Sequence, residues 1–255
     1  MTQAIFITGA ASGIGRATAK LFAERGWLVG IYDVDAAGLE SLEREVGKNQ
    51  CVRGTLDVTN ESQWQDAVAR FGQQTNGRMN ALFNCAGILR MGHFDKVPAS
   101  ESFKEVQVNV MGVIYGIYAA LPLLEKTERA CIVNMSSASA IYGTPELAVY
   151  SATKFAVRAL TEALDLEFKR KKIRVTDIMP SYVSTPMVHD QKHRAKSLKT
   201  VGVNHKAEHI AEVAWQAVNG KRAVHHLPRP ELKLFARLAG FELLGRSAMR
   251  YLSKM

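Results

Sequence analysis

The stretch Thr8-Gly9-Ala10-Ala11-Ser12-Gly13-Ile14-Gly15 decides the fold of this chain. It follows the apolar run Gln3–Ile7, which is typical of a buried strand. It precedes Ala17, Leu21 and Phe22, which recur at helical spacing. In a strand–turn–helix context, glycines let a pyrophosphate approach main-chain N–H groups at a helix N-terminus. The spacing is Gly-x-x-x-Gly-x-Gly rather than GxGxxG, and we predict a dinucleotide site here.

The remainder of the chain alternates short apolar runs with helical patterns. Strands are predicted near residues 3–8, 28–33, 51–56, 80–85, 130–136, 173–179 and 223–227, and helices near 13–25, 36–47, 60–75, 101–126, 148–171 and 206–219. This alternation predicts right-handed βαβ crossovers and a seven-stranded parallel sheet flanked by helices. We therefore predict one Rossmann-like, doubly wound α/β domain over residues 1–229, with residues 230–255 as a helical C-terminal extension.

Composition fits a single domain, since the chain has 255 residues and 47% apolar content. We find no signal sequence and no run of about 18 apolar residues that would span a membrane. The cysteines Cys51, Cys85 and Cys131 lie far apart without a CxxC motif. Reduced thiols and a cytoplasmic location are expected.

The stretch Tyr150-Ser151-Ala152-Thr153-Lys154 carries the predicted chemistry. Residues at i and i+4 share one face of a helix, so an ammonium would lie beside a phenol. A cation at that distance favours phenolate and lowers the pKa of the tyrosine toward neutrality. Ser137, from a predicted strand end, could hold the same substrate oxygen. The alternative is that YxxxK occurs by chance on a solvated helix.

Together these motifs resemble the short-chain dehydrogenase/reductase family over nearly the whole chain. The residues that carry the resemblance are Thr8 through Gly15, Asp57-Val58, Asn84-Cys85-Ala86-Gly87, Asn109, Ser137, Tyr150, Lys154 and Pro180 through Thr185. The resemblance implies a catalytic tetrad of Asn109, Ser137, Tyr150 and Lys154. Asn109 would hold a water that links Lys154 to solvent, or would be a core amide. Cys85 and Ser181 depart from the family pattern, which has Asn and Gly there.

Asp33 bears on the choice of cofactor because it falls at the end of the second predicted strand. A carboxylate there accepts hydrogen bonds from ribose hydroxyls and repels a 2′-phosphate, which favours NAD over NADP. The alternative is that Asp33 only begins a turn. Arg16 is the nearest cation after the glycine turn, and its direction is open. The resemblance implies that Asp57 accepts a hydrogen bond from the adenine amino group. The alternative is that Asp57 ends a strand or caps a helix.

The full set of expected cofactor-binding residues combines the glycine turn with the ends of later strands. It comprises Gly9, Ser12, Gly13, Ile14, Gly15, Asp33, Asp57, Val58, Asn84, Ala86, Gly87, Tyr150, Lys154, Pro180, Val183 and Thr185. No metal is expected, because neither histidine pair at i, i+4 spacing has the HExxH form.

The expected substrate is a small hydrophobic alcohol or its carbonyl partner. Apolar residues flank the motifs, although core residues would look the same; they are Leu89, Met91, Phe94, Ile141, Tyr142, Tyr182, Val183, Met187 and Val188. The polar, basic stretch 186–206 is expected to be a loop that closes over the site. The predicted function is an NAD(P)(H)-dependent oxidoreductase, and the alternative is a catalytically silent dinucleotide-binding sensor or scaffold.

Charge and the C-terminal tail bear on partners. The chain carries a net charge of +9, with −3 in residues 1–168 and +12 in residues 169–255. No nucleic-acid-reading motif is present, and no nucleic-acid partner is expected. Residues 230–255 combine apolar residues at helical spacing with basic ones. They would cover the substrate pocket, join a subunit interface, or lie on a membrane surface. By resemblance, a homodimer or homotetramer is expected.

Overall fold

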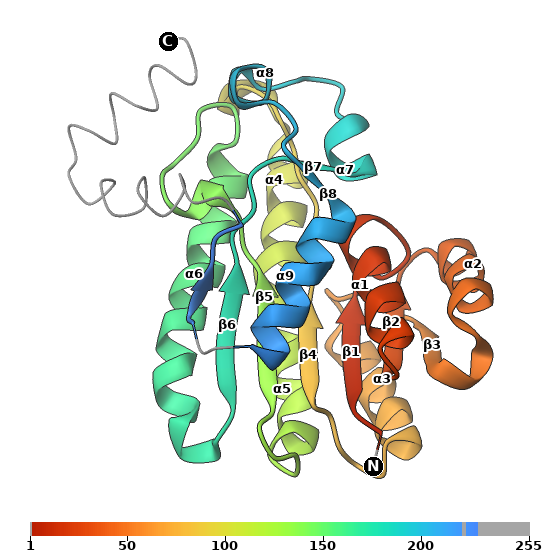
Figure 1. The fold of residues 1–255 in the computed structure, drawn as a ribbon. Helices are drawn as coiled ribbons and strands as arrows, with labels where there is room; N and C mark the ends of the chain where they lie inside the picture. Colours follow the sequence, from red (N-terminus) through yellow and green to blue (C-terminus); the bar gives the residue numbers. More distant parts are fainter. Residues whose placement is uncertain (1, 221–222, 229–255) are drawn as a thin grey trace.

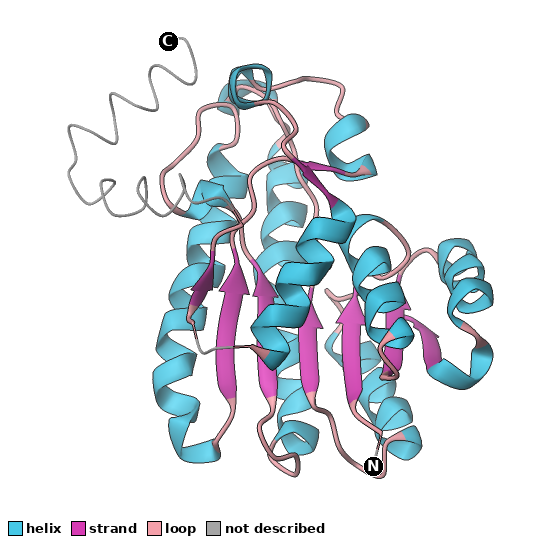
Figure 2. Ribbon diagram, viewed as in Figure 1, coloured by secondary structure: helices cyan, strands magenta, loops and turns pink. Residues whose placement is uncertain are grey.

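The computed structural model describes residues 2–220 and 223–228, and its centre is a parallel seven-stranded sheet (Figure 1, Figure 2). The strands are β1 (Ala4–Thr8), β2 (Leu28–Asp33), β3 (Cys51–Thr55), β4 (Ala81–Asn84), β5 (Cys131–Met135), β6 (Arg174–Ile178) and β9 (His225–His226). Their order is β3-β2-β1-β4-β5-β6-β9. The predicted Rossmann-like α/β fold is confirmed.

Helices cover both faces of this sheet (Figure 1). They are α1 (Gly13–Glu24), α2 (Ala36–Val46), α3 (Glu61–Gln74), α4 (Ala99–Val106), α5 (Gly112–Leu124), α6 (Ala148–Glu167), α7 (Pro186–His189), α8 (Lys196–Val201) and α9 (Ala207–Asn219). Helices α1, α2 and α9 lie on one face, and α3, α5 and α6 lie on the other.

The alternation of side chains along β1 builds both halves of the core. Ile5 and Ile7 face the first helical layer, and Ala4 and Phe6 face the second. Successive side chains of a strand point to opposite faces, so a strand covered on both sides reads as continuously apolar. This is why the run Gln3–Ile7 predicted a buried strand correctly.

The order of the strands fixes where a ligand binds. From β1 the chain builds outward through β2 and β3, and then returns to place β4 on the other side of β1. At such a reversal the connections on either side of the two strands diverge and leave a crevice at the carboxyl ends. The glycine turn after β1 and the Cys85–Gly87 segment after β4 both meet this crevice.

The structure differs from the sequence-based expectation in two places. The predicted helix 101–126 is interrupted by a π-helical turn, Gln107–Met111. The stretch 186–206 is not a plain loop, because it contains α7, α8 and β8 (His205–Lys206), and β8 pairs with β7 (Val183–Ser184), which lies just before the stretch. The C-terminal extension 230–255 lies outside the described residues.

Helical segment Ala99–Leu124 also bears on the membrane question. It is long enough to span a membrane, and its most apolar 18-residue window has a mean hydropathy of 1.5 and is 33% buried. The sequence-based expectation concerned consecutive apolar residues, and polar residues such as Gln107 and Asn109 do interrupt this helix. A helix that covers a sheet passes the same test, and α5 packs against the core through Val113, Ile117 and Ala120.

Candidate active site

A cavity of about 940 Å³ opens at the carboxyl ends of the strands. It runs from the glycine turn past Asp33 and Asp57 to Ser137, Tyr150 and Lys154. Of the expected site residues, the wall contains Gly9, Ser12, Gly13, Ile14, Gly15, Asp33, Asp57, Val58, Ala86, Gly87, Ser137, Tyr150, Lys154, Pro180, Val183 and Thr185. Only Asn84 and Asn109 of the predicted set lie off this wall.

The glycine turn leaves main chain where side chains would otherwise stand. Gly9 has a φ of +69°, and a Cβ there would lie 2.9 Å from the main chain of Ala86. A Cβ on Gly15 would lie 2.1 Å from the carbonyl oxygen of Gly9. Ser12 precedes α1 without a side-chain cap, so the first N–H groups of the helix remain available beside the cavity. This cradle fits the pyrophosphate of a dinucleotide.

Thr8 fastens the glycine turn to the end of β4, and sequence reasoning gave it no role. Its buried hydroxyl accepts hydrogen bonds from the N–H groups of Cys85 and Ala86, both at 3.1 Å. The two walls of the crevice are thereby held together. The Cys85 side chain lines the cavity, and burial raises the pKa of its thiol to about 12. The thiol is therefore protonated at neutral pH.

Asp33 lies on the cavity wall at the end of β2. Its Oδ2 accepts a hydrogen bond from the N–H of Ala11, and its Oδ1 accepts one from the N–H of Asp35. Arg16 points to α2 instead, where it bonds to the carbonyl of Gly38 and to Glu45. It also donates to the carbonyl of Ala11 in the glycine turn, and it is not part of the cavity wall.

Asp57 and Asn84 have different surroundings. Asp57 lines the cavity, and its Oδ1 accepts hydrogen bonds from the N–H and hydroxyl of Thr59. The side chain of Asn84 is buried beneath the cavity and donates to Asn134, which in turn donates to Thr161. Asn84 therefore links β4 to β5 rather than facing the large cavity.

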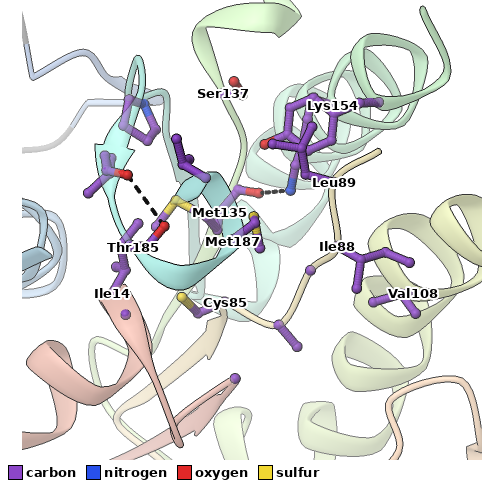
Figure 3. A pocket seen from close by; sticks show the side chains of 18 of the residues that line it. Ile14, Cys85, Ile88, Leu89, Val108, Met135, Ser137, Lys154, Thr185 and Met187 are labelled. Atoms are coloured by element: carbon purple, nitrogen blue, oxygen red, sulfur yellow. Dashed lines mark hydrogen bonds between the residues drawn. The ribbon is translucent and has the colours of Figure 1, made fainter. Parts of the chain in front are cut away.

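Tyr150, Ser137 and Lys154 meet at the inner end of the cavity. Helix α6 places Tyr150 and Lys154 one turn apart, and Ser137 follows β5. The Nζ of Lys154 donates a 2.7 Å hydrogen bond to the main-chain oxygen of Met135 (Figure 3). Burial lowers the pKa of Lys154 to about 8.

The pKa of Tyr150 departs from the sequence-based expectation. Burial raises it above its ordinary value, while the Ser137 hydroxyl lowers it through a hydrogen bond. The expectation that Lys154 lowers the pKa of Tyr150 toward neutrality is contradicted, because this pKa lies above its ordinary value. The ammonium lies 5.6 Å from the centre of the tyrosine ring and is directed to Met135. Buried phenol is protonated at neutral pH, so Tyr150 is poised in this structure as a proton donor.

Asn109 acts on the cavity wall from behind. Its Oδ1 accepts from the N–H of Ile88 at 2.8 Å, and its amide nitrogen donates to the carbonyl of Ile88 and to Thr153. Because both amide hydrogens are used, the side chain works as a bridge between the wall and α6. A role for Asn109 in holding a water stays a prediction.

Glu105 was missed by sequence reasoning. It is fully buried one helical turn before Asn109, and its Oε1 accepts a 2.7 Å hydrogen bond from the N–H of Arg90. Burial raises the pKa of Glu105 to about 7. The available signal was a carboxylate four residues before Asn109 in an otherwise apolar helical pattern, which also predicts that both side chains share one face.

Similarity to known proteins agrees with this geometry. The model of the short chain dehydrogenase family matches residues 3–196. This chain belongs to that family. It is 37% identical over 185 residues to 2,5-dichloro-2,5-cyclohexadiene-1,4-diol dehydrogenase of Sphingobium indicum, covering 71% of this chain and 73% of the relative.

Two further comparisons bear on the chemistry. Cyclopentanol dehydrogenase of Comamonas sp. is 32% identical over 189 residues, with 72% of this chain and 74% of that protein covered. The crystal structure of 3-ketoacyl-(acyl-carrier-protein) reductase from Brucella melitensis, complexed with NADH, superposes with a TM-score of 0.80 at 30% identity. It covers 88% of this chain and 95% of that one. This short-chain dehydrogenase is thus an enzyme of the alcohol dehydrogenase/reductase type that uses a nicotinamide dinucleotide.

The wall residues divide the work of such an enzyme. The nicotinamide, when bound, supplies the hydride donor or acceptor. The glycine turn and the start of α1 would hold its pyrophosphate. Ser137 can hold the substrate oxygen by a hydrogen bond, and Tyr150 can give a proton to that oxygen or take one from it. Lys154 keeps a positive charge beside both groups at neutral pH.

The substrate end of the cavity is mostly apolar. Of the residues proposed for it, six line the wall: Leu89, Tyr142, Tyr182, Val183, Met187 and Val188. Met91 and Ile141 are buried behind the wall, and Phe94 is 72% exposed on the surface. The described residues contain no group of three side chains placed to bind a metal.

Proposed function

We propose that this short-chain dehydrogenase uses NAD(H) to interconvert a hydrophobic secondary alcohol, cyclic alcohols included, with its ketone, or an alcohol with its aldehyde. The observation that carries the cofactor choice is Asp33 on the cavity wall together with Arg16 bonded to α2. A carboxylate in this position favours two ribose hydroxyls over a phosphate. Because the Arg16 side chain is bonded to main-chain oxygens and to α2, a 2′-phosphate beside Asp33 would meet the carboxylate without a pairing partner from Arg16.

The apolar wall supports the substrate class. Leu147, Val188 and Leu198 belong to a buried apolar cluster that packs against Tyr150 and Tyr182. Two relatives are named for cyclic alcohols, the cyclohexadienediol and cyclopentanol dehydrogenases, and they support the same substrate class. A substrate that buries carbon against this wall gains roughly 25 cal/mol per Å².

A screen of hydrophobic secondary alcohols and ketones tests the proposal through NADH absorbance. We expect cyclopentanol and cyclohexanol to be oxidised with NAD, and small charged hydroxy acids to be turned over at least about tenfold less efficiently, since one unpaired charge costs well over 1.4 kcal/mol in an apolar site. Turnover of the hydroxy acids alone would contradict the substrate class.

We also propose a cytoplasmic homodimer or homotetramer. The three cysteines are free thiols. Large apolar side chains are exposed on α4, α5 and α6, among them Phe103, Tyr118 and Leu166. A second copy of the chain that covers them would remove this apolar area from water.

For residues 230–255 the proposal retains three alternatives: pocket cover, subunit interface and membrane surface. Flotation of anionic liposomes with the full chain and with a chain ending at residue 229 separates the last alternative from the others. Flotation of the full chain alone supports membrane contact. If neither form floats and the truncated chain loses activity or dimerisation, the segment belongs to the enzyme.

A further inference from the structure

A buried carboxylate lies between the catalytic helix and the segment that covers the substrate end of the cavity. Glu146 immediately precedes Leu147 and α6, and its side chain is 3% exposed. We define the cover segment as residues 186–201, which contains α7 and α8. The cover segment contributes five residues to the cavity wall: Pro186, Met187, Val188, Ser197 and Val201.

Both oxygens of Glu146 are used to hold this segment. Oε2 accepts a 2.6 Å hydrogen bond from the N–H of Lys196, at the start of α8. Oε1 lies 3.3 Å from the Nε2 of His193, in the cover segment, and 3.3 Å from the Nε2 of His93, in the loop before α4. The main-chain oxygen of Glu146 accepts from the N–H of Gly92 at 2.9 Å. One residue therefore joins three separate segments of chain.

A second group of contacts holds the cover segment through uncharged hydrogen bonds at Gln191. The side chain of Gln191 donates to the carbonyl oxygens of Leu89 and Met187 and accepts from the N–H of Met91. Beneath it, Val188 and Leu198 pack into the apolar cluster. The Gln191 contacts do not titrate, so they hold this part of the cover segment equally at any pH.

The charges that face Glu146 come from each element packed against it. They are the imidazoles of His93 and His193, and the phenol of Tyr182 is also close enough for the carboxylate to raise its pKa. Burial opposes ionisation of Glu146, but the N–H of Lys196 and the two histidines outweigh it and hold the pKa of the carboxyl below its usual value. The carboxylate is therefore charged through the range, about pH 5 to 8, in which imidazoles commonly titrate.

We propose that Glu146 is a positioning residue for the substrate-side wall: it fastens the cover segment to the loop before the catalytic helix, and His93 and His193 make this fastening tighter as pH falls. This inference rests on the proposed function for its effect on substrate. Protonation of either imidazole turns a neutral contact into an ion pair with a carboxylate already in place. Each histidine side chain is about half exposed, which limits the gain to the range of surface ion pairs.

Hydrogen–deuterium exchange of the cover segment tests the inference without turnover. After correction for intrinsic exchange, we expect the wild-type segment to be roughly two- to fivefold better protected at pH 6 than at pH 8. The double variant His93→Gln/His193→Gln should lose this difference. Glu146→Gln should lose it as well, because an amide cannot form an ion pair. His189→Gln is the matched control, since His189 lies in the same segment but contacts Ser184.

Exchange of peptides from the central sheet, in the same experiment, shows whether each variant is folded. Because both histidine side chains are about half exposed, the double variant should fold even if Glu146→Gln does not. Equal pH dependence in the wild type and the double variant would overturn the proposal. With a hydrophobic alcohol that turns over, KM should rise at least about twofold in Glu146→Gln at pH 6, with a smaller change in kcat. Failure to find any turnover would count against the proposed function alone, because the exchange measurement decides the role of Glu146 independently.

Discussion

The Oδ2 atom of Asp33 accepts a hydrogen bond from the main-chain N–H of Ala11 at 3.0 Å. This contact joins the end of β2 to the glycine turn after β1. A carboxylate held at that point by the main chain cannot easily turn away from a ligand in the cavity. The glycine turn therefore fixes the position of Asp33, and the cofactor preference should follow from that position.

We predict that kcat/KM is at least about tenfold higher with NAD than with NADP, a difference of 1.4 kcal/mol or more. Asp33→Ala combined with Val34→Arg should reduce or reverse this preference, because Val34 is exposed at the cavity wall and an arginine there can pair with a phosphate. Asp33→Asn, which removes only the charge, is the control. Its preference for NAD should lie between that of the wild type and that of the double variant. A preference for NADP in the unmodified enzyme would contradict the assignment.

Glu105 should make stability depend on pH. Its folded pKa of about 7 lies above the ordinary 4.5, so the folded state binds the proton more tightly. The stability of the wild type due to this group is full below pH 4.5 and is lost as pH rises through 7. We predict that Glu105→Gln is more stable than the wild type at pH 8, by up to about 3 kcal/mol, and that the difference shrinks at pH 5. Urea unfolding at the two pH values measures it.

Glu101→Gln is the matched control for Glu105, one turn earlier on α4. Its carboxylate bonds to the Arg90 side chain, which lowers the pKa of Glu101. The effect of the substitution on stability therefore has the opposite sign, and Glu101→Gln should be slightly less stable than the wild type at pH 8. The same pH-independent difference for both variants would show that the Glu105 carboxyl does not titrate as described.

The exposed apolar residues of α4, α5 and α6 should mark a contact between subunits. Tyr118 is 74% exposed on α5, and Tyr118→Glu would place a charge in an apolar contact. We predict that this variant lowers the mass measured by light scattering after size-exclusion chromatography, from a dimer or tetramer toward a smaller species. Phe94→Glu, at an equally exposed site outside these helices, should keep the wild-type mass. An unchanged mass for Tyr118→Glu would place the interface elsewhere.

Local patterns made most of the fold and the centre of the site predictable. The glycine turn and the Tyr150–Lys154 pair could be read from sequence because strand alternation and one helical turn fix their geometry locally. Asn84 could not be placed, because its burial beneath the cavity depends on Asn134 of the neighbouring strand. The helices α7 and α8 were missed because they span only four and six residues, too few turns to show a period.

Electrostatics were the least predictable part of the site. The i, i+4 spacing of Tyr150 and Lys154 correctly places both on one helix face, but it does not show where the ammonium donates its hydrogen bonds. That depends on Met135, which reaches α6 only through the sheet. The burial that raises the pKa of Tyr150 is likewise a property of the assembled cavity.

The most direct test of the account compares the wild type with Tyr150→Phe, using a hydrophobic secondary alcohol and NAD. The ring still packs in the variant, but the phenolic oxygen that transfers the proton is gone. We predict that kcat falls by roughly 10²–10⁴-fold. The affinity for NADH, measured by fluorescence, should stay within about twofold, because a tenfold loss would require about 1.4 kcal/mol of lost contacts. Tyr118→Phe controls for the substitution at a distant site. Retention of more than about a tenth of the wild-type kcat by Tyr150→Phe would contradict the assignment of Tyr150 as the proton-transferring residue.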